Sequence, residues 1–209
     1  MTLSWLLNVA IGYVLGSIPS GLVVGYLWLH RDIRKSGSGV IGATNVLRTA
    51  GRLPAVIVMV ADVLKGVIPA VLGRLVFKDD TAAALGASAA IVGHVWPVFA
   101  GFRGGRGVAT AFGGILGLAP LVALVFPLVG LALVVPTRYV SLMSVVGTPV
   151  SAVIVAVTAA AGWEPWVFAA YALFAVCIIE YRHIPNIRRL LAGTEPKFGH
   201  GGDRVATGG

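Results

Sequence analysis

LSWLLNVAIGYVLGSIPSGLVVGYLWL, residues 3–29, runs for 27 positions without a charged side chain. About 20 apolar residues are enough to cross the hydrocarbon core of a bilayer as a helix. The run is too long for the core of a signal peptide, and it lacks a basic leader and a cleavage site. The whole chain is 57% hydrophobic and 11% charged, which does not describe a water-soluble domain. We therefore expect an all-α integral membrane protein, a single polytopic domain over residues 1–209.

Apolar runs of similar length recur along the chain. They are Leu53–Phe77, Thr81–Phe102, Val140–Ala161 and Trp166–Ile179. The segment Val108–Pro136 is ambiguous, because it carries Pro120 and Pro127. It could cross once at a steep tilt, or twice as a short hairpin that turns near Ala119-Pro120.

The basic residues decide between these alternatives, because lysine and arginine collect in cytoplasmic loops. They lie in the first loop (Arg31, Arg34, Lys35, Arg48, Arg52), the third (Arg103, Arg106) and the tail (Arg182, Arg188, Arg189, Lys197, Arg204). With the N-terminus outside, all three regions are cytoplasmic only if Val108–Pro136 crosses twice. The pattern therefore favours about seven spans and a cytoplasmic C-terminus, with five or six as alternatives.

One loop between apolar runs has the composition of an anion site. Residues 101–110 read GFRGGRGVAT. Glycines allow backbone N–H groups to approach a ligand, the two arginines supply charge, and a helix starting at Val108 would direct its N-terminal amides toward the loop. A phosphate-type anion at a membrane surface fits this pattern.

The first loop offers a second candidate site. Ser36-Gly37-Ser38-Gly39, followed by Thr44 and Asn45, supplies backbone and hydroxyl donors between Arg34 and Arg48. A flexible linker is the alternative, but Gly-Ser linkers seldom carry flanking arginines and resume an apolar pattern so soon.

Charges inside the apolar runs are costly, at about 2.5–3.5 kcal/mol each on insertion scales. Asp62 and Lys65 stand three residues apart on one helix face. They form either a self-neutralising pair or a site in which Lys65 holds an anion and Asp62 orients it or an arginine. His94, near the inner end of the next run, is either a packed histidine or a catalytic one.

The tail predicts a short interfacial helix. Pro185 suits its first position and Gly193 its end, with Asn186 and Arg189 on one polar face. Residues 198–209 are Gly-rich and expected to be disordered. The single cysteine, Cys177, excludes an intrachain disulfide.

Three segments together resemble one family. They are Gly16–Gly21 with the loop Asp32–Arg48, then Gly93-His94 through Gly104–Thr110, then Arg182-His183 with Asn186-Ile187 through Gly193–Lys197. In order and spacing, over nearly the whole chain, these segments are similar to the motif regions of the bacterial acyl-phosphate-dependent glycerol-3-phosphate acyltransferases, the PlsY type. Two positions depart from that pattern: Arg106 stands where the family usually has lysine, and Val40 where it has asparagine.

The resemblance implies transfer of a fatty acyl group from acyl phosphate to the 1-hydroxyl of sn-glycerol 3-phosphate, the first step of phospholipid synthesis. It implies catalytic roles for Ser38, His183 and Asn186, and orienting roles for Asp62 and Glu195. The residues expected to bind substrate are Arg34, Asn45, Arg48, Lys65, His94, Arg103, Gly104, Gly105, Arg106, Gly107, Thr110, Arg182, Arg188 and Arg189. Ser38 acts either as a hydrogen-bond donor, which we prefer, or as an acyl carrier. The hydroxyl proton goes to the donor phosphate, to His183 or to His94.

The expected setting is the bacterial inner membrane, with the site facing the cytoplasm. We expect a monomer that contacts membrane lipids and its two substrates, with no cofactor, metal or nucleic acid. The alternative function is transport of an anionic, phosphate-bearing metabolite. A transporter normally shows repeated halves, whereas the polar motifs here gather on one side.

Overall fold

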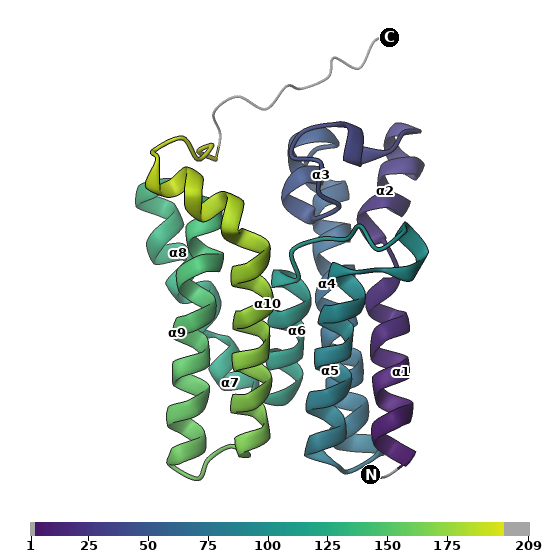
Figure 1. The fold of residues 1–209 in the computed structure, drawn as a ribbon, viewed down its shortest axis with the longest axis vertical. Helices are drawn as coiled ribbons and strands as arrows, with labels where there is room; N and C mark the ends of the chain where they lie inside the picture. Colours follow the sequence, from purple (N-terminus) through teal and green to yellow (C-terminus); the bar gives the residue numbers. More distant parts are fainter. Residues whose placement is uncertain (1–2, 199–209) are drawn as a thin grey trace.

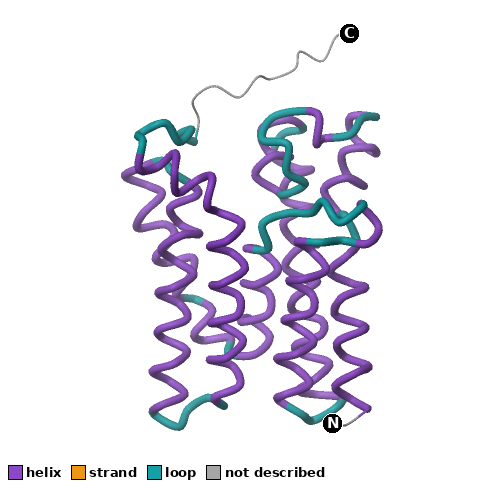
Figure 2. The backbone as a smooth tube through the Cα atoms, viewed as in Figure 1, coloured by secondary structure: helices purple, strands orange, loops and turns teal. Residues whose placement is uncertain are grey.

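The computed structural model describes residues 3–198, and within that range its regular elements are all helical (Figure 2). The α-helices are α1 Leu3–Ser17, α2 Ser20–Leu29, α3 Ala43–Thr49, α4 Arg52–Val71, α5 Asp80–Val95, α6 Val108–Leu118, α7 Pro120–Ala123, α8 Val125–Thr137, α9 Val140–Ala160 and α10 Trp166–Leu191. Three short helices complete the set: the 3-10 helices η1 Ile33–Lys35 and η3 Val98–Ala100, and the π-helical turn η2 Leu72–Val76. The expectation of an all-α membrane protein is confirmed.

Six helical stretches are long and apolar enough to cross a membrane. They are Leu3–Leu29, Arg52–Val76, Asp80–Ala100, Pro120–Thr137, Val140–Ala160 and Trp166–Leu191. The first is interrupted at Ile18-Pro19, where α1 ends and α2 begins, because proline has no N–H to continue the helical ladder.

The ambiguous segment turns at the position predicted from its sequence. Helix α6 ends at Leu118, and α7 starts at Pro120 after a break at Ala119. Figure 1 shows α6 descending between the other helices and α8 rising beside α9. With 11 residues, α6 extends about 16 Å, roughly half of the hydrocarbon core. The start of α1 and the end of α10 lie at opposite ends of the bundle (Figure 1). Seven crossings and the outside N-terminus remain predictions.

The separate interfacial helix was predicted wrongly. Helix α10 continues through Pro185 to Leu191, and Figure 1 shows it bending near this end. The side chains of Ile179, His183 and Asn186 stay on one buried face. A bend relieves the proline's steric clash, so packing along that face outweighs the local helix-breaking preference. The predicted stop at Gly193 is confirmed by its φ of 68°.

The tail beyond the helix returns to the bundle. The Phe198 N–H donates to the Arg138 carbonyl at 2.7 Å. The rest of the segment expected to be disordered lies outside the described residues.

Glycines let the helices of the first half approach each other closely. A Cβ at Gly12 would collide with the Gly86 carbonyl, and one at Gly66 would collide with the Thr110 carbonyl. Lipid tails are as apolar as the helices, so no hydrophobic effect drives helices together within a membrane. Close packing favours their association instead, and small residues at the contacts allow it. As a result, α4 and α6 meet backbone to backbone.

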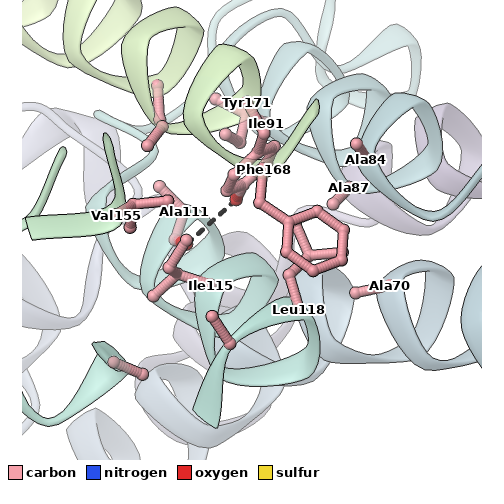
Figure 3. Close-up of a cluster of buried hydrophobic side chains, with 14 of the residues drawn as sticks. Ala70, Ala84, Ala87, Ile91, Ala111, Ile115, Leu118, Val155, Phe168 and Tyr171 are labelled. Carbon is pink, nitrogen blue, oxygen red and sulfur yellow. Dashed lines mark hydrogen bonds between the residues drawn. The ribbon is translucent and has the colours of Figure 1, made fainter. Parts of the chain in front are cut away.

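The main apolar core joins the two halves of the molecule around α6. Leu118 and Phe168 lie in this core, with the alanines of α4 and α5 on one side and Val155 of α9 on the other (Figure 3). Since α6 lies between the two groups of helices, its position determines where the loop before it is held.

Candidate active site

Three segments distant in sequence line one cleft of about 560 Å³. Its walls are Asp32, Arg34, Lys35, Gly39 and Val40 of the first loop, Phe102, Arg103 and Gly104 of the glycine loop, and Arg182 of α10. All three segments lie toward the same end of the bundle (Figure 1). The structure thus brings part of each predicted motif to one cleft. The predicted site residues Ser38, Arg106, Thr110, His183, Asn186 and Arg189 are not among its lining.

The first loop is organised by Asp32 and Arg34. The Asp32 carboxylate accepts hydrogen bonds from the Arg34 N–H at 2.9 Å and from its guanidinium Nε and Nη2, the latter at 2.7 Å. The guanidinium hydrogen bond, together with the Arg34 charge, holds the pKa of Asp32 below its usual value although burial opposes this. Arg34 lines the cleft, but its ion pair with Asp32 already neutralises part of its charge.

Asn45 shapes the tip of that loop. Its Oδ1 accepts from the Ser38 N–H at 2.8 Å, and its Nδ2 donates to the carbonyls of Ile33 and Ser36, each at 3.1 Å. Gly37 adopts φ of 60°, and a Cβ there would collide with the Asn45 amide. The buried amide thus holds the turn that leaves Ser38 exposed.

The glycine loop folds back over the end of α5. Figure 2 shows it crossing the bundle to reach α6. The Gly104 N–H donates to the Val95 carbonyl at 3.2 Å, and the Gly105 N–H to the His94 carbonyl at 3.0 Å. A Cβ at Gly105 would strike the His94 ring. These glycines are therefore required for packing on α5, as well as for the close approach to a ligand expected from the sequence.

The same loop begins α6 with its N-terminus unblocked. Gly107 precedes the helix with φ of 86°, and no described side chain caps its first amides. Thr110 in the first turn is fully buried, and its hydroxyl has no hydrogen-bond partner among the described residues. Free amides, the helix dipole and a spare hydroxyl suit an anion.

A buried polar network lies behind the loop. Lys65 donates to Asp62 Oδ1 at 2.6 Å and to the Ser20 hydroxyl at 2.7 Å, and Ser20 donates to the same Asp62 oxygen. His94 Nδ1 lies 3.5 Å from that oxygen. Lys65 and His94 were expected to touch substrate, but the bonds described here tie them to Asp62. The ion pair of the self-neutralising alternative is present, and substrate contact by Lys65 and His94 stays a prediction.

The end of α10 carries the third motif. His183 is buried, and its Nδ1 lies 2.8 Å from the Ile179 carbonyl. That contact requires the proton on Nδ1 and leaves Nε2 as an acceptor. Asn186 Nδ2 donates to Glu195 Oε1, and Arg189 Nε to Glu195 Oε2, each at 2.7 Å. Burial raises the pKa of Glu195, but the neighbouring Ser141 hydroxyl, these two hydrogen bonds and the Arg189 charge outweigh it and hold the pKa below its usual value.

Arg106 lies near three other arginines and near Glu195. Burial lowers its pKa, and so do the nearby charges of Arg189, Arg48 and Arg182, with Glu195 as the opposing charge. An excess of cations around a partly buried arginine is favourable when an anion occupies the space between them.

Two expected residues lie less centrally. Arg103 is exposed at the rim of the cleft, and Arg188 is exposed and absent from its lining. Within residues 3–198, no three His, Cys, Asp or Glu side chains are grouped as they would be to hold a metal ion.

The family model described as glycerol-3-phosphate acyltransferase matches residues 6–193. The chain belongs to the glycerol-3-phosphate acyltransferase family. It is 44% identical over 195 residues to glycerol-3-phosphate acyltransferase 2 of Moorella thermoacetica, covering 93% of this chain and 98% of the relative. It is 42% identical over 193 residues to the glycerol-3-phosphate acyltransferase of Rubrobacter xylanophilus, covering 92% and 94%.

Solved structures of the family share the fold. Two crystal structures of PlsY, an integral membrane glycerol 3-phosphate acyltransferase, match with TM-scores of 0.86 and 0.84, the first in its glycerol 3-phosphate form and the second in its lysophosphatidic acid form. Their sequence identities are 41% and 40%, and each match covers 94% of this chain and 96% of that chain. The chain is therefore a multi-pass membrane protein, and the resemblance drawn from its three motifs is confirmed.

Two members of the site were not singled out from the sequence. Ser20, within the first motif, joins the Asp62 network. Ser141, at the start of α9, is buried near Glu195. A serine inside an apolar run carries no local signal, because its role depends on which carboxylate another helix brings to it.

Proposed function

We propose that this protein transfers a fatty acyl group from acyl phosphate to the 1-hydroxyl of sn-glycerol 3-phosphate. The products are 1-acylglycerol 3-phosphate (lysophosphatidate) and inorganic phosphate. The names of its relatives and the glycerol 3-phosphate form of PlsY support the acceptor. Within this chain, the observation that carries the proposal is the cleft of about 560 Å³ to which all three motif regions contribute basic side chains: Arg34, Lys35, Arg103 and Arg182.

The charge requirement of the reaction matches this group. Each phosphate carries about −1.5 to −2 charges near neutral pH, so two phosphorylated substrates repel each other unless cations surround both. Arg48, Arg106, Arg182 and Arg189 come from the first loop, the glycine loop and α10. They therefore reach the same space from several directions.

The donor phosphate is best placed at the start of α6. There the backbone amides that follow Gly107 and the Thr110 hydroxyl face a loop of glycines. A small apolar cavity of about 30 Å³ is lined by residues of α6, α8, α9 and α10, among them Val108 in the first turn of α6. This cavity has room for only the first methylene groups of an acyl chain attached to that phosphate, each favourable by about 0.8 kcal/mol when buried, so the rest of the chain would lie against lipid.

The acceptor belongs on the opposite wall, beside the first loop. Ser38 is exposed at the loop tip next to Gly39, which lines the cleft together with Arg34, Lys35 and Arg103. In this arrangement Ser38 donates a hydrogen bond to a phosphate or carbonyl oxygen. Asn45 accepts a hydrogen bond from the Ser38 N–H, and this bond fixes the turn that carries the Ser38 side chain.

For the chemical step, the protein has to position the two substrates, and no protein nucleophile is required. Acyl phosphate is an activated mixed anhydride, so the hydroxyl attacks the carbonyl directly and phosphate leaves with the bonding electrons. The departing phosphate takes the hydroxyl proton, which needs no specialised base. His183 is the alternative acceptor through its Nε2. His94 is less suited, because Asp62 engages it.

We assign supporting roles to the buried polar groups. One such group is the network of Ser20, Asp62, Lys65 and His94. It supports the His94 ring, against which Gly105 packs. Glu195 orients Asn186 and Arg189. We also propose that the chain is a single polytopic domain in the bacterial inner membrane, with its site facing the cytoplasm. In this proposal the protein is a monomer in contact with lipids and uses no cofactor.

The deciding experiment supplies purified protein with palmitoyl phosphate and labelled glycerol 3-phosphate, with acyl-CoA and acyl-carrier-protein donors in parallel. Lysophosphatidate formed from palmitoyl phosphate alone is the expected result. Activity confined to acyl-CoA would contradict the proposed donor. A folded protein inactive with every donor, but able to move glycerol 3-phosphate across a vesicle membrane, would favour a transporter.

A further inference from the structure

Helix α6 is a half-length membrane helix whose two ends have different tasks. Its N-terminus faces the site, and its last residue, Leu118, lies in the apolar core. The final carbonyls of a helix lack partners within it. At membrane depth an unpaired carbonyl costs several kcal/mol. The end of α6 therefore needs a donor from another helix.

Arg74 supplies that donor. Its Nη1 donates to the Leu118 carbonyl at 2.7 Å. The guanidinium is itself held by Asp80 at 3.6 Å and lies 5.5 Å from the centre of the buried Phe168 ring. A cation at a helix C-terminus also interacts favourably with the helix dipole. Three elements, η2, α5 and α10, thus converge on the end of α6.

A second directional bond reaches the other end of the helix. The Tyr171 hydroxyl donates to the Ala111 carbonyl at 2.9 Å, drawn in Figure 3. Ala111 follows Thr110 in the first turns of α6. Tyr171 is buried, and a Cβ at Gly114 would collide with its hydroxyl. The tyrosine therefore fits closely over a glycine and bonds next to the anion-facing turn.

Between these two hydrogen bonds, the surface of α6 that meets α4 has few protruding side chains. Gly66 and Gly113 place bare backbone against bare backbone along this contact. Interdigitated side chains are what usually fix the register of two packed helices. The two directional bonds are accordingly well suited to set how deep α6 lies.

We infer that Tyr171 and Arg74 are positioning residues for the donor phosphate: together they set the depth of α6, and hence the place of the amides after Gly107. This inference rests on the proposed function. Neither side chain lines the cleft, and Tyr171 borders only the small apolar cavity, so both act on the phosphate position through the helix. A small displacement of a binding group is enough to cost a large factor in rate or affinity.

The test compares Tyr171→Phe and Arg74→Met with the unaltered protein. In purified, folded protein the KM for palmitoyl phosphate should rise by about fivefold or more in each variant, while the KM for glycerol 3-phosphate changes less than about twofold. Arg74→Lys keeps a charged donor and should fall between. It carries the test if Arg74→Met does not fold.

A matched control removes a hydrogen bond that does not involve α6. Trp5→Phe loses the Trp5 Nε1 donation to Asp79, 2.6 Å long, between α1 and the start of α5. It should lower the unfolding temperature with both KM values unchanged. If Tyr171→Phe, and Arg74→Met where it folds, behave like this control, the two residues are merely structural and the inference is overturned. Absence of activity in the unaltered protein would instead refute the proposed function.

Discussion

Asn186 donates a hydrogen bond from Nδ2 to Oε1 of Glu195 at 2.7 Å, so a residue beyond the end of α10 holds a residue inside it. The turn between them is made by Gly193, with φ of 68°. Asn186 Oδ1 has no partner among the described residues. With the amide nitrogen engaged by Glu195, this oxygen is left to accept a hydrogen bond from a substrate hydroxyl or from a nearby arginine.

Glu195 predicts a pH dependence of stability. Its pKa is lowered in the folded protein, so its carboxylate stabilises the fold above its ordinary pKa of 4.5, and this contribution is lost as the pH falls through the lowered value. Glu195→Gln should therefore unfold at a lower temperature at neutral pH, with the difference from wild type closing in acid.

Glu164 is the control for this effect, because burial raises its pKa. The ionised form of such a group opposes folding, so Glu164→Gln should not lower the unfolding temperature at neutral pH. Thermal unfolding in detergent, followed from pH 7 to about pH 3.5, measures both variants. A Glu195→Gln deficit that stays constant over this range would contradict the assignment.

Ser38→Ala should lose about 100-fold or more in kcat while remaining folded. A positioned donor to a developing oxyanion is typically worth that factor. The turn itself should survive, since Asn45 binds the Ser38 backbone and not its hydroxyl. Near-normal turnover in a protein with an unchanged unfolding temperature would remove Ser38 from the mechanism.

At position 106, we expect lysine to preserve most of the activity and a neutral residue to lose it. Arg106→Lys keeps the charge among Arg48, Arg182 and Arg189 but loses the planar fork. Its kcat/KM should stay within about tenfold of wild type, and Arg106→Met should fall by about 100-fold or more. Arg52→Met, at the exposed start of α4, is the control for general loss of charge. Equal activity of Arg106→Met and Arg52→Met would place the phosphates elsewhere.

The Asp62–Lys65 pair should show strong coupling. Lys65→Met leaves the Asp62 carboxylate buried without its ammonium partner, 2.6 Å away in the native protein, and should cost about 3–5 kcal/mol of unfolding free energy. Adding Asp62→Asn removes the stranded charge and should recover part of that loss. Unfolding in mixed micelles for both single variants and the double variant gives the coupling energy, and simple additivity would argue against the pair.

The site was predictable to different degrees in its three parts. Glycines, arginines and a break in apolar character mark residues 101–110 locally, since each feature has a conformational or electrostatic meaning of its own. The tail was harder to predict. Pro185 reads as the start of a new helix, yet the buried face of α10 carries the helix through it. Local propensity was outweighed by packing that no neighbouring residue reveals.

The sequence by itself determined the membrane class and the three motifs, and it offered the turn at Ala119-Pro120 as one of two alternatives, because apolar length, proline and glycine act through the chain immediately around them. Tertiary structure alone decided that Lys65 binds Asp62 and Ser20, that Asn45 holds a turn, and that Arg106 lies among three other arginines. The physical reason is that hydrogen bonds and charge interactions depend on distance in space, and only the packing of helices around α6 sets those distances.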